Sequence, residues 1–433
     1  MTGSRIPAVG PLGRVAALPA ETSIVVGLIS GSHFVNHMYL VLLPPILGIL
    51  SGDFGVTLAA LGFAMGLQGA INTVMQLPYG YLSDNHSRTL TLGVCLGFGA
   101  AGVLVIALAP SFVWLLVGQA LIGLGVAGHH PSHYPLLADA SPESIRGRVF
   151  SVHGFAGSLG FAAPPTIITA IIAFSGLTWR HALGLIGVVG AGYAVFAIVV
   201  LRWFVSAEVR LPSPESTTTE RRSIAERVKT ELASLASSPA ILALAALALV
   251  TSTASWGITS YVVVLLTDGY GIKLSLANFT LSGMYLAGAV MILIGGELTD
   301  RFSAGPVIVV AYSIVALIVA VLGSLTIPGM IAVACAIGIG GTRSLAGPAR
   351  SKLTDRLSAR TDLGKNFATI TIGIMLGNAF APPFFGALIE RAGLRITFLT
   401  IAAIGVVAVG LTIAILRTYS EDFTIISSAV SGR

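Results

Sequence analysis

The segment Gly80-Tyr81-Leu82-Ser83-Asp84 returns 216 residues later as Gly296-Glu297-Leu298-Thr299-Asp300. This recurrence decides the fold, because each copy closes an apolar stretch that is long enough to cross a membrane. Other segments repeat at shifts of 216 to 218 residues, among them Ala163-Pro164-Pro165, which matches Ala381-Pro382-Pro383. A nearly constant shift over so much of the chain indicates two related halves that arose by duplication.

Long apolar stretches fill the sequence on both sides of these segments. Only 10% of the 433 residues are charged, whereas soluble domains average about a quarter. Hydropathy, with Gly and Pro as punctuation, predicts an all-α integral membrane protein with twelve transmembrane helices. The expected spans are 22–50, 57–82, 90–109, 112–134, 149–174 and 181–204, then 239–266, 275–298, 305–325, 328–349, 365–390 and 394–418.

The spans divide the chain into two pseudo-symmetric six-helix bundles, residues 1–204 and 239–433, and a linker over 205–238. Four apolar residues of the linker recur at helical spacing: Ile224, Val228, Leu232 and Leu235. This spacing predicts an amphipathic helix along the membrane surface. A simple tether between the two bundles is the alternative.

The basic residues predict the orientation in the membrane. Of the 24 Lys and Arg residues, 19 lie in the termini and in loops after even-numbered spans, and four lie in loops after odd-numbered spans. The positive-inside rule then places both termini in the cytoplasm and the chain in the cytoplasmic membrane. The net charge of +6 comes from these loops and does not indicate nucleic-acid binding. Cys95 and Cys335 both lie inside spans and imply no disulfide framework.

Twelve spans in two halves, a long middle loop and the repeated Gly-x-x-x-Asp segment resemble the major facilitator superfamily over the whole chain. The resemblance implies a monomeric secondary transporter that works by alternating access. No nucleotide-binding motif is present, and no cofactor is expected.

The resemblance also implies a cytoplasmic latch, in which the aspartate meets the positive end of a helix and the basic residue pairs across the loop. An ordinary charged turn is the alternative. The matching latch positions are Gly80, Asp84, Arg88, Gly296, Asp300 and Arg301.

A closer resemblance concerns spans one and four. Two segments are similar to the fosmidomycin-resistance branch: Ser32-His33-Phe34-Val35-Asn36, which a Leu-Pro-Pro run follows, and His130-Pro131. This resemblance implies a proton-driven exporter of drugs or small molecules. Two positions depart from the pattern. His37 stands where that branch usually has an aspartate, and Gln119 aligns near the superfamily's span-four arginine. Span five carries only part of the glycine-proline pattern that is typical of antiporters, so import remains an alternative direction of transport.

All eight histidines lie in the first half. His33, Asn36 and His37 share one helix face, and the resemblance places spans one and four on a common cavity, where these residues would face His130 and His133. No Asp or Glu lies deep within a span. Imidazole has an unperturbed pKa of about 6.5, so His33, His37 and His130 are the predicted proton carriers. Helix packing is the alternative role for each.

Arg343 lies inside span ten, and the repeat places it near Gly128 of the other half. A guanidinium keeps its charge, and its planar fork of donors suits a carboxylate or phosphonate. We therefore expect Arg343 to hold an anionic group of the substrate. The alternative is that it reaches the cytoplasmic surface beside Arg350. The predicted substrate site comprises His33, Asn36, His37, Tyr39, Gln68, His130, His133, Trp256, Arg343 and Asn378.

Two other functions fit some of these residues. Imidazole suits transition metals, so His33, His37, His129 and His133 could carry a metal or metal chelate as cargo, although Pro131 is expected to interrupt the second pair. A membrane-embedded zinc hydrolase needs a general base beside the metal, which the run from His129 to His133 lacks. The sequence favours proton-coupled efflux of a small organic solute, with an anion as the expected class.

Overall fold

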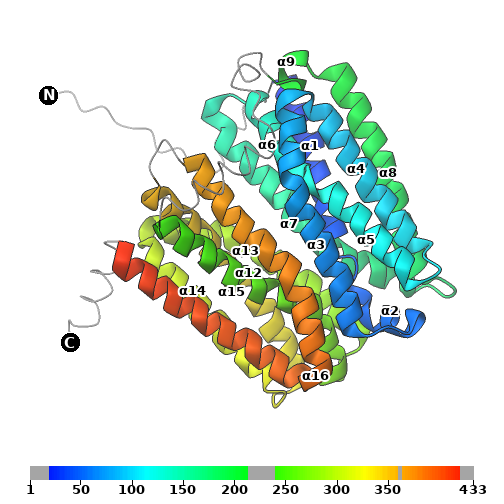
Figure 1. The fold of residues 1–433 in the computed structure, drawn as a ribbon, viewed down its shortest axis with the longest axis vertical. Helices are drawn as coiled ribbons and strands as arrows, with labels where there is room; N and C mark the ends of the chain where they lie inside the picture. The colour runs from blue at the N-terminus through cyan, green and yellow to red at the C-terminus, as the bar shows by residue number, and fades with distance from the viewer. Residues whose placement is uncertain (1–18, 213–238, 359–362, 420–433) are drawn as a thin grey trace.

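The computed structural model describes residues 19–212, 239–358 and 363–419, and the regular secondary structure of this part of the chain is helical. The helices gather into two bundles that lie side by side (Figure 1). Eleven of the described helical segments are long and apolar enough to cross a membrane. The amphipathic helix predicted around Ile224 lies outside the described residues.

The first bundle contains two predicted spans that the structure interrupts, one near Pro44 and one at Gly128. The chain leaves α1 after Leu40 and makes a 3-10 turn at Pro44 and Pro45, because proline has no N–H for the helix ladder. The fourth span is divided at Gly128 into α5 and α6. The elements are α1 (Ala20–Leu40), η1 (Pro44–Ile46), α2 (Leu47–Phe54), α3 (Leu58–Asn85), α4 (Arg88–Ala107), α5 (Phe112–Ala127), α6 (His129–Asp139), α7 (Glu143–Ile172), α8 (Trp179–Phe204) and α9 (Ala207–Arg210).

The second bundle ends in a helical segment of 57 residues, α16. A straight helix of that length would measure roughly 85 Å, far more than a hydrocarbon core of about 30 Å. Its backbone leaves the helical region at Gly393, where φ is 79° and ψ is 170°, and its two parts appear as separate orange and red rods in Figure 1. These parts match the predicted spans 365–390 and 394–418, so the predicted twelve-helix architecture is confirmed. The elements are α12 (Pro239–Val264), η2 (Leu265–Gly269), α13 (Leu274–Arg301), α14 (Ala304–Gly323), α15 (Gly329–Leu357) and α16 (Leu363–Tyr419).

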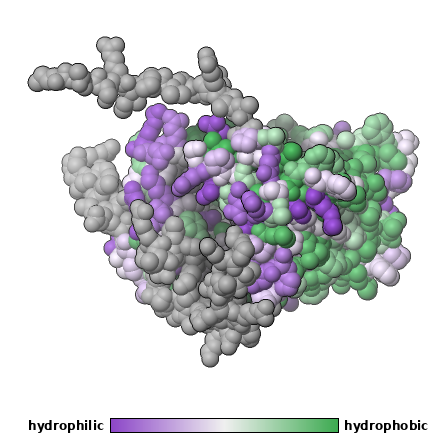
Figure 2. Space-filling view, turned by 90° about the horizontal axis from the view of Figure 1, so that it is seen from above, coloured by the Kyte–Doolittle hydropathy of each residue, from purple (hydrophilic) through white to green (hydrophobic). Residues whose placement is uncertain are grey.

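Glycine allows the helices of a bundle to approach closely. A methyl group on Gly102 of α4 would lie 2.6 Å from the carbonyl oxygen of Gly118 on α5, so a larger residue there would force the two helices apart. Small residues at such contacts are typical of membrane helix packing. The outer surface is correspondingly apolar. Figure 2 shows hydrophobic residues over the flank and hydrophilic residues gathered on the end face that is viewed.

The two bundles contact each other through α7 with α13 and through α3 with α16. The hydroxyl oxygens of Thr166 on α7 and Ser282 on α13 lie 2.9 Å apart. The N–H of Ala59, at the start of α3, donates to a carboxylate oxygen of Glu390 at 2.8 Å. Because Ala59 and Asp84 are at opposite ends of α3, these contacts join the bundles at the end away from the Gly-x-x-x-Asp segments.

Candidate solute cavity and histidine cluster

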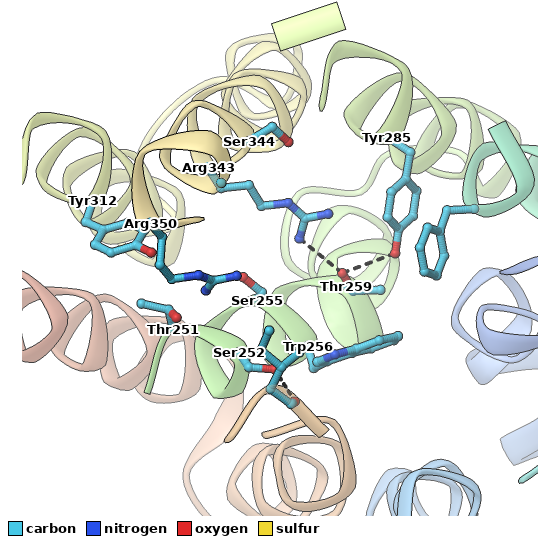
Figure 3. Close-up of a pocket in the computed structure, with 13 residues that line it drawn as sticks. Thr251, Ser252, Ser255, Trp256, Thr259, Tyr285, Tyr312, Arg343, Ser344 and Arg350 are labelled. Atoms are coloured by element: carbon cyan, nitrogen blue, oxygen red, sulfur yellow. Dashed lines mark hydrogen bonds between the residues drawn. The ribbon is translucent and has the colours of Figure 1, made fainter. Parts of the chain in front are cut away.

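A cavity of about 270 Å³ opens beside α12, α13 and α15. Twelve of its 13 lining residues come from the second bundle, and Phe161 of α7 is the contribution of the first. Among the polar residues that line the cavity are Ser252, Ser255, Thr259, Tyr285, Arg343 and Arg350 (Figure 3). A solute there would contact hydroxyl groups, aromatic rings and two guanidinium groups.

Helical spacing explains how α12 lines this cavity. Ser252, Ser255, Trp256 and Thr259 are three or four residues apart, so their side chains project from one face of the helix. Trp256 was expected in the site, whereas the neighbouring hydroxyl residues were not. The signal that could have found them is this polar stripe within an otherwise apolar span.

Two arginines of α15 give the cavity its charge. Arg343 and Arg350 are seven residues apart, about two helical turns, and both line the cavity. An Nη1 of Arg343 lies 3.5 Å from the Thr259 hydroxyl, and its guanidinium carbon lies 5.4 Å from the ring centroid of Tyr285 (Figure 3). The lining residues include no Asp or Glu. The cavity therefore presents two positive charges without a negative one, which is an environment that attracts anions.

Six histidines of the first bundle form a single cluster. It contains His33 and His37 of α1, His129, His130 and His133 of α6, and His153 of α7. The ring centroid of His33 lies 4.0 Å from those of both His37 and His153, and 4.7 Å from that of His129. Three helices thus bring together rings that are up to 120 positions apart in the sequence.

Pro131 does not separate His129 from His133, so the expected interruption is wrong. Their ring centroids lie only 3.5 Å apart. Pro131 lies in the first turn of α6, which begins at His129. N–H groups in a first turn have no partner within the helix, so a residue without an N–H is tolerated there.

Hydrogen bonding at His33 and His37 shows which ring nitrogens carry protons. Nδ1 of His33 lies 2.8 Å from the His153 carbonyl oxygen, and Nδ1 of His37 lies 3.0 Å from the Gly157 carbonyl oxygen. A carbonyl oxygen only accepts, so each Nδ1 must donate a hydrogen. The two Nε2 atoms face each other at 2.9 Å, and in neutral rings both would carry a lone pair. A further proton between them turns this repulsive contact into a hydrogen bond, so the pair suits one added proton.

The histidine cluster and the arginine cavity are adjacent but separate. None of the histidines is among the 13 residues that line the cavity, so this cavity does not bring the predicted histidines together with Arg343. Phe161 lies between the two sites. Its ring centroid is 4.2 Å from that of His37 and 5.1 Å from that of Tyr285, on which it stacks.

Four other predicted site residues lie outside the cavity lining. The Asn36 amide donates to the Gly125 carbonyl oxygen at 3.4 Å, and the Gln68 amide donates to the Tyr39 carbonyl oxygen at 3.2 Å. The Tyr39 side chain is buried within the first bundle. Polar groups in a membrane protein need internal partners, and the amides of Asn36 and Gln68 find them between helices rather than in the cavity. Asn378 lies on α16, partly buried and also away from the lining.

Three of the predicted latch residues, Arg88, Asp300 and Arg301, form ion pairs. Arg88 pairs with Asp139 of α6 at 2.6 Å and also donates to the Val209 carbonyl oxygen at 2.8 Å. In the second half, Lys352 of α15 pairs with Asp300 at 3.3 Å. Arg301 pairs instead with Glu297, one turn away on its own helix. Among the described residues, a methyl group on Gly80 or on Gly296 would meet no atom within 4 Å, so neither glycine is closely packed here.

Comparisons with known proteins agree with this architecture. The family model of the Major Facilitator Superfamily matches residues 29–265 and 244–424. The MFS-type transporter YfnC of Bacillus subtilis is 25% identical over 394 residues, which cover 89% of this chain and 90% of the relative. The fosmidomycin resistance protein of Escherichia coli is 27% identical over 296 residues, 65% of this chain and 66% of the relative. A bacterial homolog of the human lysosomal transporter Spinster, solved in an inward-facing and occupied conformation, has a TM-score of 0.77 at 16% identity, covering 94% of this chain and 99% of that one.

Proposed function

The chain belongs to the major facilitator superfamily, and from that premise we propose that it exports a small organic anion by proton-coupled alternating access. It is a multi-pass membrane transporter and not an enzyme. The observation that carries the proposed substrate class is the cavity with Arg343, Arg350 and no lining carboxylate. The distribution of basic loops supports a cytoplasmic membrane location with both termini inside.

The cavity suits an anion with an apolar body. Arginine can bind a carboxylate or phosphonate with two parallel hydrogen bonds, and such charge-assisted bonds are stronger than neutral ones. The hydroxyl groups of Ser255 and Thr259 can complete the contacts of the anionic group. The rings of Trp256 and Tyr285 offer apolar surface to the rest of the molecule. The volume of about 270 Å³ suits a small solute.

We place the transported proton between His33 and His37. With the proton present, the two Nε2 atoms form a hydrogen bond, and both rings stay bonded to the carbonyl oxygens of α7. Loss of the proton leaves two lone pairs 2.9 Å apart, so the rings must move and the contact of α1 with α7 weakens. Phe161 transmits this change, because it is one turn beyond Gly157 on α7 and its ring contacts both His37 and Tyr285. The likeness to the fosmidomycin resistance protein supports export as the direction.

The substrate proposal is tested with the purified protein in proteoliposomes, a pH gradient and a panel of small carboxylates and phosphonates. For any transported anion, we expect Arg343→Gln to lower the transport rate at subsaturating substrate by at least about tenfold. This is the change that the loss of one charge-assisted hydrogen bond should produce. Arg356→Gln is the matched control, because Arg356 is on the same helix but does not line the cavity. Equal transport by the Arg343 variant and the control would reject an anion site at Arg343.

The coupling proposal needs a separate measurement of proton flux. We expect His37→Gln to keep exchange of substrate between the two sides but to lose accumulation driven by a pH gradient, because glutamine cannot carry the added proton. A pH-sensitive dye inside the vesicles reports the proton movement. The control is His86→Gln, which changes an exposed histidine outside the cluster. Gradient-driven accumulation that survives in the His37 variant would exclude this pair as the proton carrier.

A further inference from the structure

We propose that the histidine cluster is also a binding site for a divalent transition-metal ion, with His33, His129, His130 and His153 as ligands. One ring nitrogen from each of these four residues lies within 4.8 Å of all the others. Nitrogens around a tetrahedral zinc ion are separated by roughly 3.3 Å, given Zn–N bonds of about 2.0 Å. The four rings therefore need only small rotations to surround an ion. This inference does not depend on the proposed transport of an anion.

Unpaired ring nitrogens in the cluster are the second observation that points to a ligand. Nε2 of His129 and Nδ1 of His130 are buried and have no hydrogen-bond partner. Both nitrogens of His133 and at least one nitrogen of His153 are likewise unpaired. The side chains of His129 and His153 are only 1% and 2% exposed. Buried polar atoms without partners are rare in proteins and call for an explanation, and a metal ion supplies a partner for several of these nitrogens at once.

His33 is already oriented as a metal ligand. Its Nδ1 donates to the His153 carbonyl oxygen, which leaves Nε2 with a lone pair. Histidine ligands of metals usually have this arrangement, in which a hydrogen bond from one ring nitrogen fixes the tautomer and orients the other. The ring of His33 also stacks on that of His153 at 4.0 Å. A metal ion on Nε2 of His33 would take the place of the proton that this atom shares with His37.

The donor set determines the class of metal. The four ligands are neutral imidazoles, and no Asp, Glu or Cys belongs to this group in the described part of the chain. Imidazole suits zinc, cobalt, nickel and copper, whereas magnesium and calcium require oxygen ligands. His130 is partly exposed, whereas the other three residues of the group are buried. The four residues come from α1, α6 and α7, and a bound ion would therefore hold these helices together.

Metal binding is tested on the full chain in detergent, purified with a tag that contains no histidine and stripped with EDTA. After equilibration with Zn²⁺ and gel filtration, mass spectrometry should find about one zinc per chain. His129→Gln and His153→Gln should each weaken zinc binding at least about tenfold, since each removes one ligand. His86→Gln changes an exposed histidine outside the group and should bind as the unaltered protein does. An excess of Mg²⁺ should not displace the zinc.

The unaltered protein provides a readout that does not require a variant to fold. X-ray absorption of the bound zinc should show only nitrogen neighbours, and Co²⁺ in its place should give the visible absorption of a four-coordinate ion. Three results would each overturn the proposal. The first is that the unaltered protein does not retain zinc. The second is that the absorption spectrum shows sulfur or carboxylate ligands. The third is that folded His129 and His153 variants retain as much zinc as the unaltered protein. Thermal unfolding in the presence and absence of zinc verifies that the variants are folded.

Discussion

Phe161 is the one residue that touches both the histidine cluster and the arginine cavity among the contacts described. Its ring lies against His37 on one side and stacks on Tyr285 on the other, and Tyr285 in turn lies beneath the Arg343 guanidinium. The proposed coupling of proton and solute therefore passes through one aromatic side chain. Packed side chains with two arrangements are a physical route for such coupling.

We predict that Phe161→Ala separates proton movement from solute movement. The cavity keeps both arginines, and the variant loses only one weak apolar contact with the solute. The affinity for a transported anion should therefore change by less than about tenfold. The proton-to-solute ratio should fall, because the ring that joins His37 to Tyr285 is gone. Both quantities are measured in the same vesicles.

Phe155→Ala is the matched control for this prediction. Phe155 is on the same helix, but its side chain is 49% exposed and does not line the cavity. It should keep the unaltered ratio. A Phe161 variant with the same ratio as this control would show that coupling takes another route.

At the scale of helices, the contact between α1 and α7 depends on glycine. A methyl group added to Gly157 would lie 2.5 Å from Cε1 of His33 and 2.7 Å from Nε2. The His33 ring cannot simply rotate away, because it is bonded to the His153 carbonyl oxygen and lies among other rings. Gly157→Ala should therefore displace the His33 ring, lower proton-driven transport and weaken zinc binding at least about tenfold.

Gly154→Ala makes the same change one turn earlier on α7, where the added methyl group would meet no atom within 4 Å. Alanine favours a helix over glycine by roughly 1 kcal/mol in both positions, so the comparison isolates the contact with His33. We expect the Gly154 variant to transport normally and to unfold at the same or a slightly higher temperature. Equal loss of activity in both variants would indicate a general effect on α7 rather than on the cluster.

The spans were predictable from sequence because membrane helices need a long apolar stretch, and the repeated segments fixed their number. The last two spans could be separated at residues 391–393, and the backbone of α16 does leave the helical region at Gly393. The interruption of the helix after Leu40 was harder to predict from the sequence. Pro44 and Pro45 end the helix ladder locally, but the surrounding residues are apolar, so hydropathy alone joined α1 and α2 into one span.

The site was less predictable than the spans, because residue type does not show which side of a helix faces a cavity. Gln68 and Tyr39 are polar residues at membrane depth, and both were expected in the cavity. They form a contact within the first bundle instead. Conversely, Arg350 and Phe161 line the cavity, and neither was expected to bind solute. The direction in which a helix face points depends on its neighbours, which a single sequence does not specify.

At the scale of the whole molecule, the proposed mechanism requires the two bundles to separate where they now touch. The hydroxyl groups of Thr166 and Ser282 join α7 to α13, and the Ser282 hydroxyl also contacts the Ala162 carbonyl oxygen at 2.7 Å. In the orientation that the basic loops predict, these contacts close the cavity on the outer side. Release of an exported solute would then require Thr166 and Ser282 to move apart.

A disulfide across this contact should stop transport. The two hydroxyl oxygens are 2.9 Å apart, so sulfur atoms in their places are close enough to bond after small side-chain rotations. We would make Thr166→Cys and Ser282→Cys together in a chain that also carries Cys95→Ala and Cys335→Ala, because both native cysteines are free. Oxidation should abolish transport, and a reducing agent should restore it, whereas each single cysteine variant should be insensitive to both treatments. Full transport by the oxidised double variant, with the disulfide verified by mass spectrometry, would show that α7 and α13 need not separate. Alternating access between these two bundles would then be excluded as the mechanism.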